Sequence, residues 1–284
     1  MSLTPSTLDY AADLLRSHSI DFYFWSLFIP AEHRGAVQTL LAFEIEIARI
    51  PSQVSEVSLG EIRYQWWRDS VSALSSGDES GHPVIDVLGA VTRRYSLPLQ
   101  PLIALIDAHV MDLYDDQLAD LSMLEGYIGE TYGTLIRLIS LILADGRPTG
   151  DAALAGHAAV AIGIQKIFEQ RASDLSNRQK FVPLSLLRGD VTGIPQEISN
   201  FGGTEQMDAA SRLQKISLYH LEIVKKAWRG IPDYVKPAFL PLSITKRVMR
   251  RSGKQPNLKV PTFEKLSPLR NLSALWLGYL KRSI

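Results

Sequence analysis

Three aspartates near the middle of the chain, Asp112, Asp116 and Asp120, are spaced four residues apart. On a helix this spacing places side chains on one face, about one turn apart. Carboxylates in that arrangement are able to bind Mg²⁺, a hard cation that takes oxygen ligands. Asp107 and Asp115 spread negative charge around the same predicted helix. We therefore favour a solvated helix face over a metal site, with Asp112 as an alternative buried structural acid.

A second pair of acids, Glu169 and Asp174, follows an Ala-rich predicted helix. The two carboxylates are candidates for a residual cation site. The favoured alternative is a surface loop in which Arg171 and Arg178 are their local partners.

The histidines show no metal-binding pattern. His82, His109 and His220 are expected to be isolated, since they lack the HxxxH and HExxH spacings, and none is assigned a metal role. His33 is expected on the surface. The chain has no cysteine, which excludes disulfides, thiolate metal sites and cysteine nucleophiles.

The C-terminal segment 241–284 is strongly basic and has Glu264 as its one acid. Such a tract is able to contact an anionic membrane surface. The alternative is that it packs against the acidic helix predicted over 107–130, and the sequence does not decide between the two. Its basic residues are Lys246, Arg247, Arg250, Arg251, Lys254, Lys259, Lys265, Arg270, Lys281 and Arg282.

Helices must position all of these residues, because apolar residues recur at helical spacing and no strand-like alternation is present. After Pro30, a helix with Val37, Leu40, Leu41, Ile45 and Ala48 on one face is expected to be buried. The next helix, 58–75, has a predicted buried stripe made of Leu59, Ile62, Trp66, Ser70 and Leu74. Further helices are predicted over 6–16, 84–95, 102–124, 127–144, 152–171, 204–228, 234–249 and 269–280.

Composition sets the outer bounds. The chain has 284 residues, of which 46% are hydrophobic and 21% charged, as in an ordinary globular protein with a sizeable core. Its 30 basic and 30 acidic residues balance, so a nucleic-acid partner is not expected. No secretory signal and no uncharged apolar run of about 18 residues is visible. We predict one helical domain over residues 1–284, located in the cytoplasm and possessing at most peripheral contact with the inner membrane.

Short motifs follow one another in a fixed order along nearly the whole chain. They are Phe22-Tyr23, Leu27 to Pro30, Arg34, Leu41-Ala42-Phe43, Trp67-Arg68, His82-Pro83-Val84, Tyr95 to Pro98, Asp112-Leu113, Tyr127, Tyr132-Gly133 and Phe181-Val182-Pro183. In this order they resemble the squalene/phytoene synthase family. The resemblance implies an all-α, isoprenoid-synthase-like helical bundle with a central cavity. It also implies that Phe22 and Tyr132 are vestigial substrate-binding residues.

In that family, two aspartate-rich helices hold Mg²⁺, which neutralises the leaving diphosphate of a prenyl substrate. Carried over by spacing from Ala42-Phe43, the first motif falls on residues 48–52. Its metal-ligand positions are Ala48 and Ser52, and neither has a carboxylate. Arg49 places a positive charge between them.

Carried over by spacing from Pro183, the second metal motif falls on Lys166, Gln170 and Asp174, of which only Asp174 has a carboxylate. Glu169 stands where the family has a diphosphate-contacting arginine. The resemblance therefore implies degenerate motifs, no catalytic residues, no metal and no cofactor.

Within the family, the chain resembles the subgroup of mitochondrial complex I assembly factors and their bacterial counterparts. The supporting residues are Ala42-Phe43, Glu46, Ala48, Ser55-Glu56, Gln65-Trp66, Pro268-Leu269 and Leu275-Trp276-Leu277. This implies a non-catalytic helper whose protein partner is a complex I subunit, with an isoprenoid or lipid as a further candidate ligand. Two alternatives stay open: an active Mg²⁺-dependent, head-to-head prenyl diphosphate transferase with atypical ligands, and an isoprenoid or lipid carrier.

Overall fold

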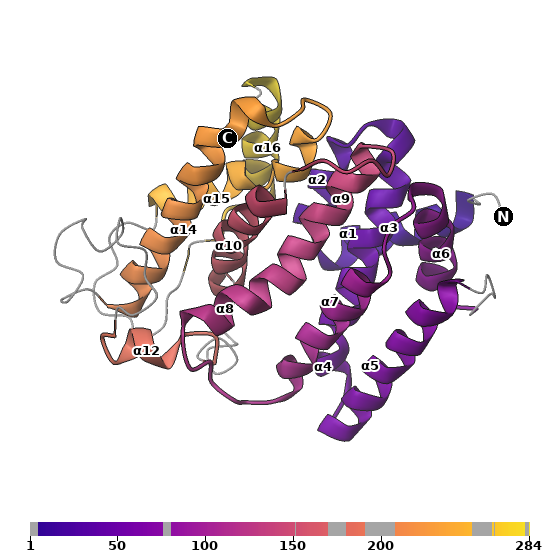
Figure 1. The fold of residues 1–284 in the computed structure, drawn as a ribbon, viewed down its shortest axis with the longest axis horizontal. Coiled ribbons are helices and arrows are strands. Elements are labelled where there is room, and N and C mark those ends of the chain that lie inside the picture. The colour runs from indigo at the N-terminus through magenta and orange to yellow at the C-terminus, as the bar shows by residue number, and fades with distance from the viewer. Residues whose placement is uncertain are drawn as a thin grey trace. The chain divides into compact units, whose positions relative to one another are not determined.

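The computed structural model describes residues 5–75, 81–150, 152–169, 180–190, 208–251, 263, 265–281 and 284. Every regular element in this part of the chain is a helix, so the predicted all-α class is confirmed (Figure 1). No helix among the described residues is both long and apolar enough to cross a bilayer. The chain divides into two compact units, and each is described by itself. A single domain over 1–284 stays a prediction.

The first unit comprises Met1–Tyr114, Thr134–Gly150 and Asp233–Ala238. Its helices are α1 (Pro5–His18), α2 (Ile20–Leu27), α3 (Ala31–Ala48), α4 (Ile50–Gln53), α5 (Val57–Ser72), η1 (Ala73–Ser75), α6 (Pro83–Tyr95), α7 (Gln100–Val110), η2 (Met111–Leu113) and α9 (Thr134–Leu143).

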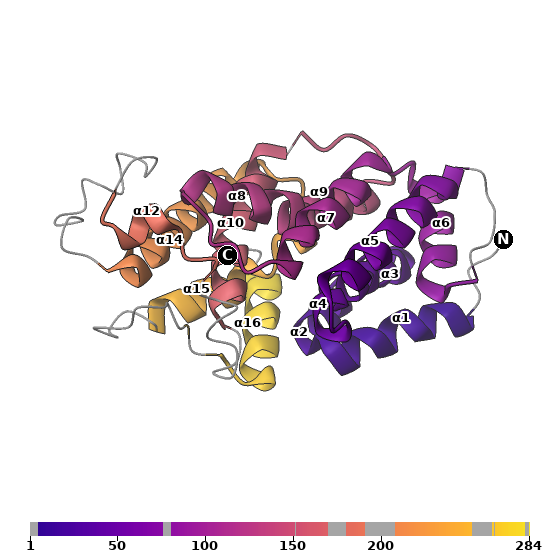
Figure 2. The ribbon, with the colours of Figure 1, turned by 90° about the horizontal axis from the view of Figure 1, so that it is seen from below.

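Helix α3 forms the centre of this unit. Every residue from Ala36 to Ile45 is buried, and a stretch of nearly three turns presents side chains in all directions. Helices α1, α2, α6, α7 and α9 all pack against α3, and Figure 2 shows α1, α3 and α6 together. The predicted stripe is therefore buried as expected up to Ile45, whereas Ala48 at the helix end is exposed.

The predicted buried face of α5 is wrong. Leu59, Ile62 and Trp66 are exposed, while the buried side of the helix consists of Gly60, Tyr64, Trp67 and Val71. Of the predicted stripe, Leu74 is buried and Ser70 half-buried. The helix has apolar residues on two faces. The face that is buried is the one that a neighbouring segment is able to approach closely. A Cβ atom at Gly60 would overlap the side chain of Leu113, so η2 fits only against the glycine side.

The second unit comprises Asp115–Gly133, Asp151–Pro232 and Phe239–Ile284. Its helices are α8 (Leu121–Ile128), the π-helical turn η3 (Gly129–Gly133), α10 (Ala152–Glu169), α12 (Leu184–Leu187), α14 (Ala209–Ala227), η6 (Trp228–Gly230), α15 (Leu242–Arg251) and α16 (Pro268–Lys281). A last element, η7 (Lys236–Phe239), spans the division between the units.

Helix α10 is the core of the second unit because its small residues allow close packing. Ala155, Ala158, Ala159 and Ala161 are buried, and α14, α15, α8 and η3 all pack against this helix. A Cβ atom at Gly163 would lie 2.5 Å from Ile128 Cγ2, so the glycine is required for α8 to approach.

The single helix predicted over 102–124 is also wrong. Helix α7 ends at Val110, and the backbone around Leu118 is extended instead: Leu118 N donates to Lys180 O at 2.9 Å, and Leu184 N donates to Leu118 O at 2.9 Å. Asp120 is the N-cap of α8 and accepts a hydrogen bond from Met123 N at 3.0 Å. The interpretation of the three aspartates as one helix face is therefore wrong. The alternative in which the basic C-terminal segment packs against residues 107–130 stays a prediction, although these residues do not form the single helix that it assumed.

The turn after α9 yields a test of this architecture. Gly146 has φ +78° and donates its N–H to Leu141 O at 2.8 Å, a left-handed helix end that favours glycine. A Cβ atom at Gly146 would lie 2.5 Å from Tyr95 O, whereas one at Gly150, with φ +68°, would meet no described atom within 4 Å. We expect Gly150→Ala to cost about 1 kcal/mol of unfolding free energy and Gly146→Ala about 1–3 kcal/mol more. Urea denaturation measures both, and equal losses would contradict the Tyr95 contact.

Candidate functional site

The first metal motif of the sequence analysis lies at the end of α3. Arg49 caps this helix, and α4 follows directly. Ala48 and Ser52 are both exposed, and Ser52 Oγ donates to Arg49 O at 2.7 Å. The two ligand positions therefore present a methyl group and a hydroxyl group that bonds to its own turn. These residues do not fit a magnesium site, because Mg²⁺ is bound in proteins chiefly through carboxylates.

The second motif begins on α10, where an ion pair occupies the surroundings of Lys166. Glu169 is buried, and its Oε2 accepts hydrogen bonds from Lys166 Nζ at 3.1 Å and Gln165 Nε2 at 2.7 Å. Thr245 Oγ1 on α15 donates to Gln165 Oε1 at 2.8 Å. The negative charge of Glu169 is thus neutralised within its own helix, and Gln165 connects this ion pair to α15.

These contacts correct one expectation and leave another untested. Glu169 is not part of a surface loop, because it is buried on α10 and pairs there with Lys166 and Gln165. The predicted partners Arg171 and Arg178 lie outside the described residues. Gln170 and Asp174 lie outside the described residues.

The two vestigial substrate residues lie in different units. Phe22 is half-buried in α2, with its ring centroid 6.1 Å from that of Trp25, whose Nε1 donates to Pro237 O at 2.8 Å. Tyr132 is half-buried in the π-helical turn η3, next to Gly133. Their role in binding a prenyl chain stays a prediction.

A buried acid–histidine cluster in the first unit was missed by the sequence analysis. His109 on α7 lies between Glu44 on α3 and Asp112 on η2. Its Nδ1 is 2.7 Å from Asp112 Oδ2, and its Nε2 is 3.2 Å from Glu44 Oε1. Burial by itself lowers the pKa of His109. The Glu44 charge and the hydrogen bonds that His109 donates to both carboxylates outweigh this effect and raise the pKa to about 10.

An imidazolium therefore holds two carboxylates together at neutral pH, with both ring nitrogens donating. The expectation that His109 is isolated is wrong, whereas the alternative of Asp112 as a structural acid agrees with its half-buried position. The i, i+3 spacing of His109 and Asp112 was the one sequence signal available. Glu44 has no such signal, because its contact with His109 spans 65 residues of chain. Among the described residues, no group of three or more His, Asp or Glu side chains is arranged to hold a metal ion.

Other histidines also have partners that the sequence did not indicate. His157 on α10 and His220 on α14 place their Nδ1 atoms 2.8 Å apart, and His220 Nε2 is 3.5 Å from Glu125 Oε1 on α8. Burial and the neighbouring His220 lower the pKa of His157, which favours its neutral form. His33, expected on the surface, is buried, and its Nδ1 is 3.0 Å from the Tyr95 hydroxyl.

Comparison with known proteins places these observations in context. A family model described as squalene/phytoene synthase matches residues 15–272. The relatives include the NADH dehydrogenase (ubiquinone) complex I assembly factor 6 of Bos taurus, which is 30% identical over 233 residues, covering 81% of this chain and 69% of the relative. The Homo sapiens protein of the same name is 28% identical over the same shares of both chains.

Solved structures give the same fold. A dehydrosqualene synthase superposes with a TM-score of 0.75 at 15% identity, covering 98% of this chain and 97% of that one. A squalene synthase from Alicyclobacillus acidocaldarius gives 0.70 at 16% identity, covering 89% and 96%. The predicted isoprenoid-synthase-like fold is confirmed.

The buried cluster generates a stability prediction. The pKa of His109 is about 10 in the folded chain and about 6.5 when unfolded, so the folded state binds the extra proton between these values. The contribution of His109 to stability is therefore complete below about pH 6.5 and is lost as the pH rises toward 10. We expect His109→Gln to remove this alkaline decline and to cost about 3–5 kcal/mol at neutral pH, because it leaves buried carboxylates without their cation.

Urea denaturation of wild type and variant between pH 6 and pH 10 measures both effects. The double variant Glu44→Gln, His109→Gln is the matched control, since it removes one charge of each sign and should lose less than the sum of the two single variants. Parallel pH profiles for wild type and His109→Gln would contradict the assignment.

Proposed function

The chain belongs to the squalene/phytoene synthase family, and from that premise we propose that it is a catalytically inactive member that assists the assembly of respiratory complex I. The observation that carries the proposal is the shared name of its relatives, complex I assembly factor 6, at up to 30% identity over most of the chain. We place its action in the cytoplasm, at the inner membrane where complex I is built. The proposal requires no metal and no other cofactor.

The chemistry of the two motif regions supports inactivity. Release of a prenyl diphosphate requires divalent ions that neutralise the charge developing on the leaving group. Ala48 and Ser52 supply no anionic ligand at the end of α3, and Ser52 is bonded to its own turn. On α10, the cation Lys166 stands at a ligand position and is paired with Glu169.

The exposed side of α5 supports a protein partner. Leu59, Ile62 and Trp66 recur at spacings of three and four, so they share one face of the helix. Ile62 is 65% exposed and Trp66 42% exposed, although each is large and apolar. Clustered exposed apolar side chains with an aromatic residue are typical of protein interaction surfaces. We propose that this face contacts the complex I subunit.

The absence of catalysis has a direct test. Purified protein incubated with farnesyl or geranylgeranyl diphosphate and Mg²⁺ should release no diphosphate above the background without protein. An active squalene or phytoene synthase, assayed in parallel, shows that the assay detects turnover. Turnover that Asp174→Ala abolishes would overturn the proposal and favour the prenyl transferase alternative.

The assembly role is tested by deletion in the host. We expect loss of assembled NADH dehydrogenase on native gels, with rescue by the wild-type gene but not by an unrelated prenyl synthase. The double variant Ile62→Glu, Trp66→Glu should fold and fail to rescue, because it places charges on the proposed contact face. Arg63→Ala, on the same helix, is the matched control and should rescue. Normal complex I in the deletion strain would exclude the assembly role.

A further inference from the structure

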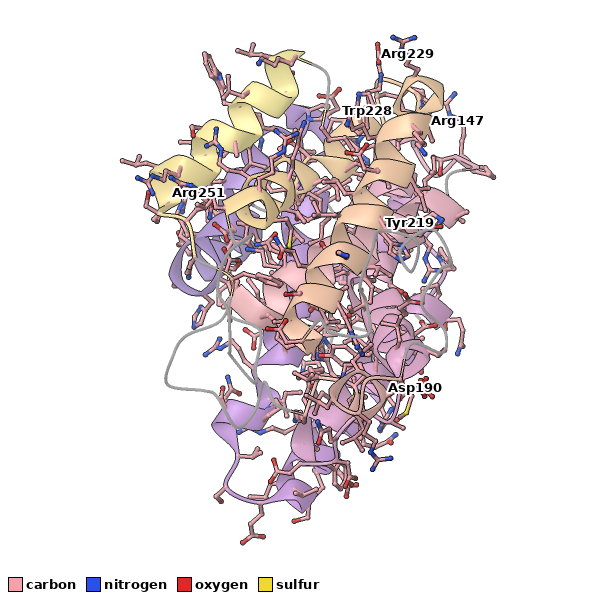
Figure 3. The ribbon with its side chains drawn as sticks, turned by 90° about the vertical axis from the view of Figure 1, so that its left-hand side faces the viewer. Arg147, Asp190, Tyr219, Trp228, Arg229 and Arg251 are labelled. Carbon is pink, nitrogen blue, oxygen red and sulfur yellow. The ribbon has the colours of Figure 1, made fainter. Side chains whose placement is uncertain are left out.

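A groove with many positive charges lies between α15 and α16, both in the second unit. The two helices pack against each other (Figure 1). Their side chains line a groove of about 520 Å³. Arg251 lies at the end of α15 next to α16, away from Trp228 and Arg229 (Figure 3). The basic residues that line the groove are Lys246, Arg247, Arg250, Arg251, Arg270 and Lys281.

In the described part of the chain, these cations form no ion pairs with acids. None of the six takes part in a salt bridge among the described residues. Arg247 Nη1 donates instead to Arg270 O at 2.9 Å and to Ser273 Oγ at 2.7 Å, which fixes this guanidinium against α16. The pKa of Lys246 is lowered by burial and by the charges of Arg250, Lys225 and Lys281, against an opposing effect of Glu222. The lining of the groove, as far as the structure describes it, therefore contains six cations and no acid.

Close packing fixes the floor of the groove. A Cβ atom at Gly278 would overlap Ser243 Oγ and lie 3.2 Å from Leu240 Cδ1, so α16 approaches α15 at a distance that only glycine permits. Both helices thus hold their basic side chains on one rigid frame rather than on a loop. A preorganised set of donors of this kind suits an anion that accepts several hydrogen bonds, such as a phosphate group.

The exposed face of α16 favours a membrane over other anionic partners. Its buried face consists of Asn271, Ala274, Leu275 and Gly278. At 100° per residue, the opposite side carries three large apolar residues: Leu269 is 77% exposed, Trp276 55% and Leu280 56%. A nucleic acid or a free phosphate would contact only the cations. A bilayer would accommodate both, since helices at membrane interfaces combine basic residues with an apolar face bearing Trp and Leu.

We propose that the groove between α15 and α16 binds the phosphate of an anionic phospholipid headgroup, while Leu269, Trp276 and Leu280 enter the membrane interface. The cations that line the groove take the place of the counter-ions at the lipid surface. The inference concerns a lipid site on the second unit and does not depend on the assembly role or on the face of α5.

The test uses the full chain and vesicles of phosphatidylcholine with or without phosphatidylglycerol. Sedimentation should show binding only to the vesicles that contain phosphatidylglycerol. Arg250 and Arg251 are exposed, so the double variant Arg250→Ala, Arg251→Ala is expected to fold. It should bind roughly thirtyfold more weakly, which corresponds to about 1 kcal/mol for each charge lost near an anionic surface. The matched control is Arg93→Ala, Arg94→Ala on α6, which removes the same charge elsewhere and should bind like wild type.

The apolar half of the proposal has its own measurement. Trp276→Ser should weaken binding to the same vesicles and remove the blue shift of tryptophan fluorescence that accompanies insertion. Circular dichroism confirms that each variant keeps its helices. Equal binding to both vesicle types, equal weakening in the α6 control, or binding of nucleic acid or inorganic phosphate without vesicle binding would each overturn the proposal.

Discussion

The burial of α3 on all sides constrains everything else in the first unit. A helix enclosed by five neighbours has no solvated face, so a charge on it must be neutralised within the protein. Glu44 is such a charge, and His109 neutralises it from α7, while Asp112 holds the other ring nitrogen. The cluster ties the centre of the unit to the segment where α7 ends. Ala48, at the last turn of α3, is positioned by this enclosed helix and nonetheless faces solvent.

The sequence predicted the helices well and their packing faces less well. Helical periodicity located α6 and α16 to within about one residue, and the confirmed fold class follows from the same signal. It placed the wrong face of α5 in the core, because both sides of that helix are apolar and the choice depends on the fit of Leu113 against Gly60. It also continued one helix across Leu118, where backbone bonds to a distant segment keep the chain extended.

The candidate site shows the same division between local and non-local information. The lost carboxylates at Ala48 and Ser52 are a local property, and the sequence is sufficient to see them. Lys166 and Gln165, the partners of Glu169, lie three and four residues earlier, but the contact of Gln165 with Thr245 crosses 80 residues of chain. His33, His109 and His220 were misjudged for one reason, since the residues they contact come from other helices. Motif spacing therefore predicts which carboxylates are absent and cannot predict which contacts the neighbouring polar groups make.

The groove between α15 and α16 has a further effect because the whole chain carries no net charge. A molecule without net charge is not attracted as a whole to a charged surface. Its long-range electrostatic interaction therefore depends on how unevenly its charges are distributed. Cations concentrated on two helices give the second unit an electric dipole, and a dipole turns in a field before contact occurs. This orienting torque acts within about one Debye length, ~8 Å at physiological ionic strength. Added salt would then slow the approach in the correct orientation more than it would weaken the apolar contacts made afterwards.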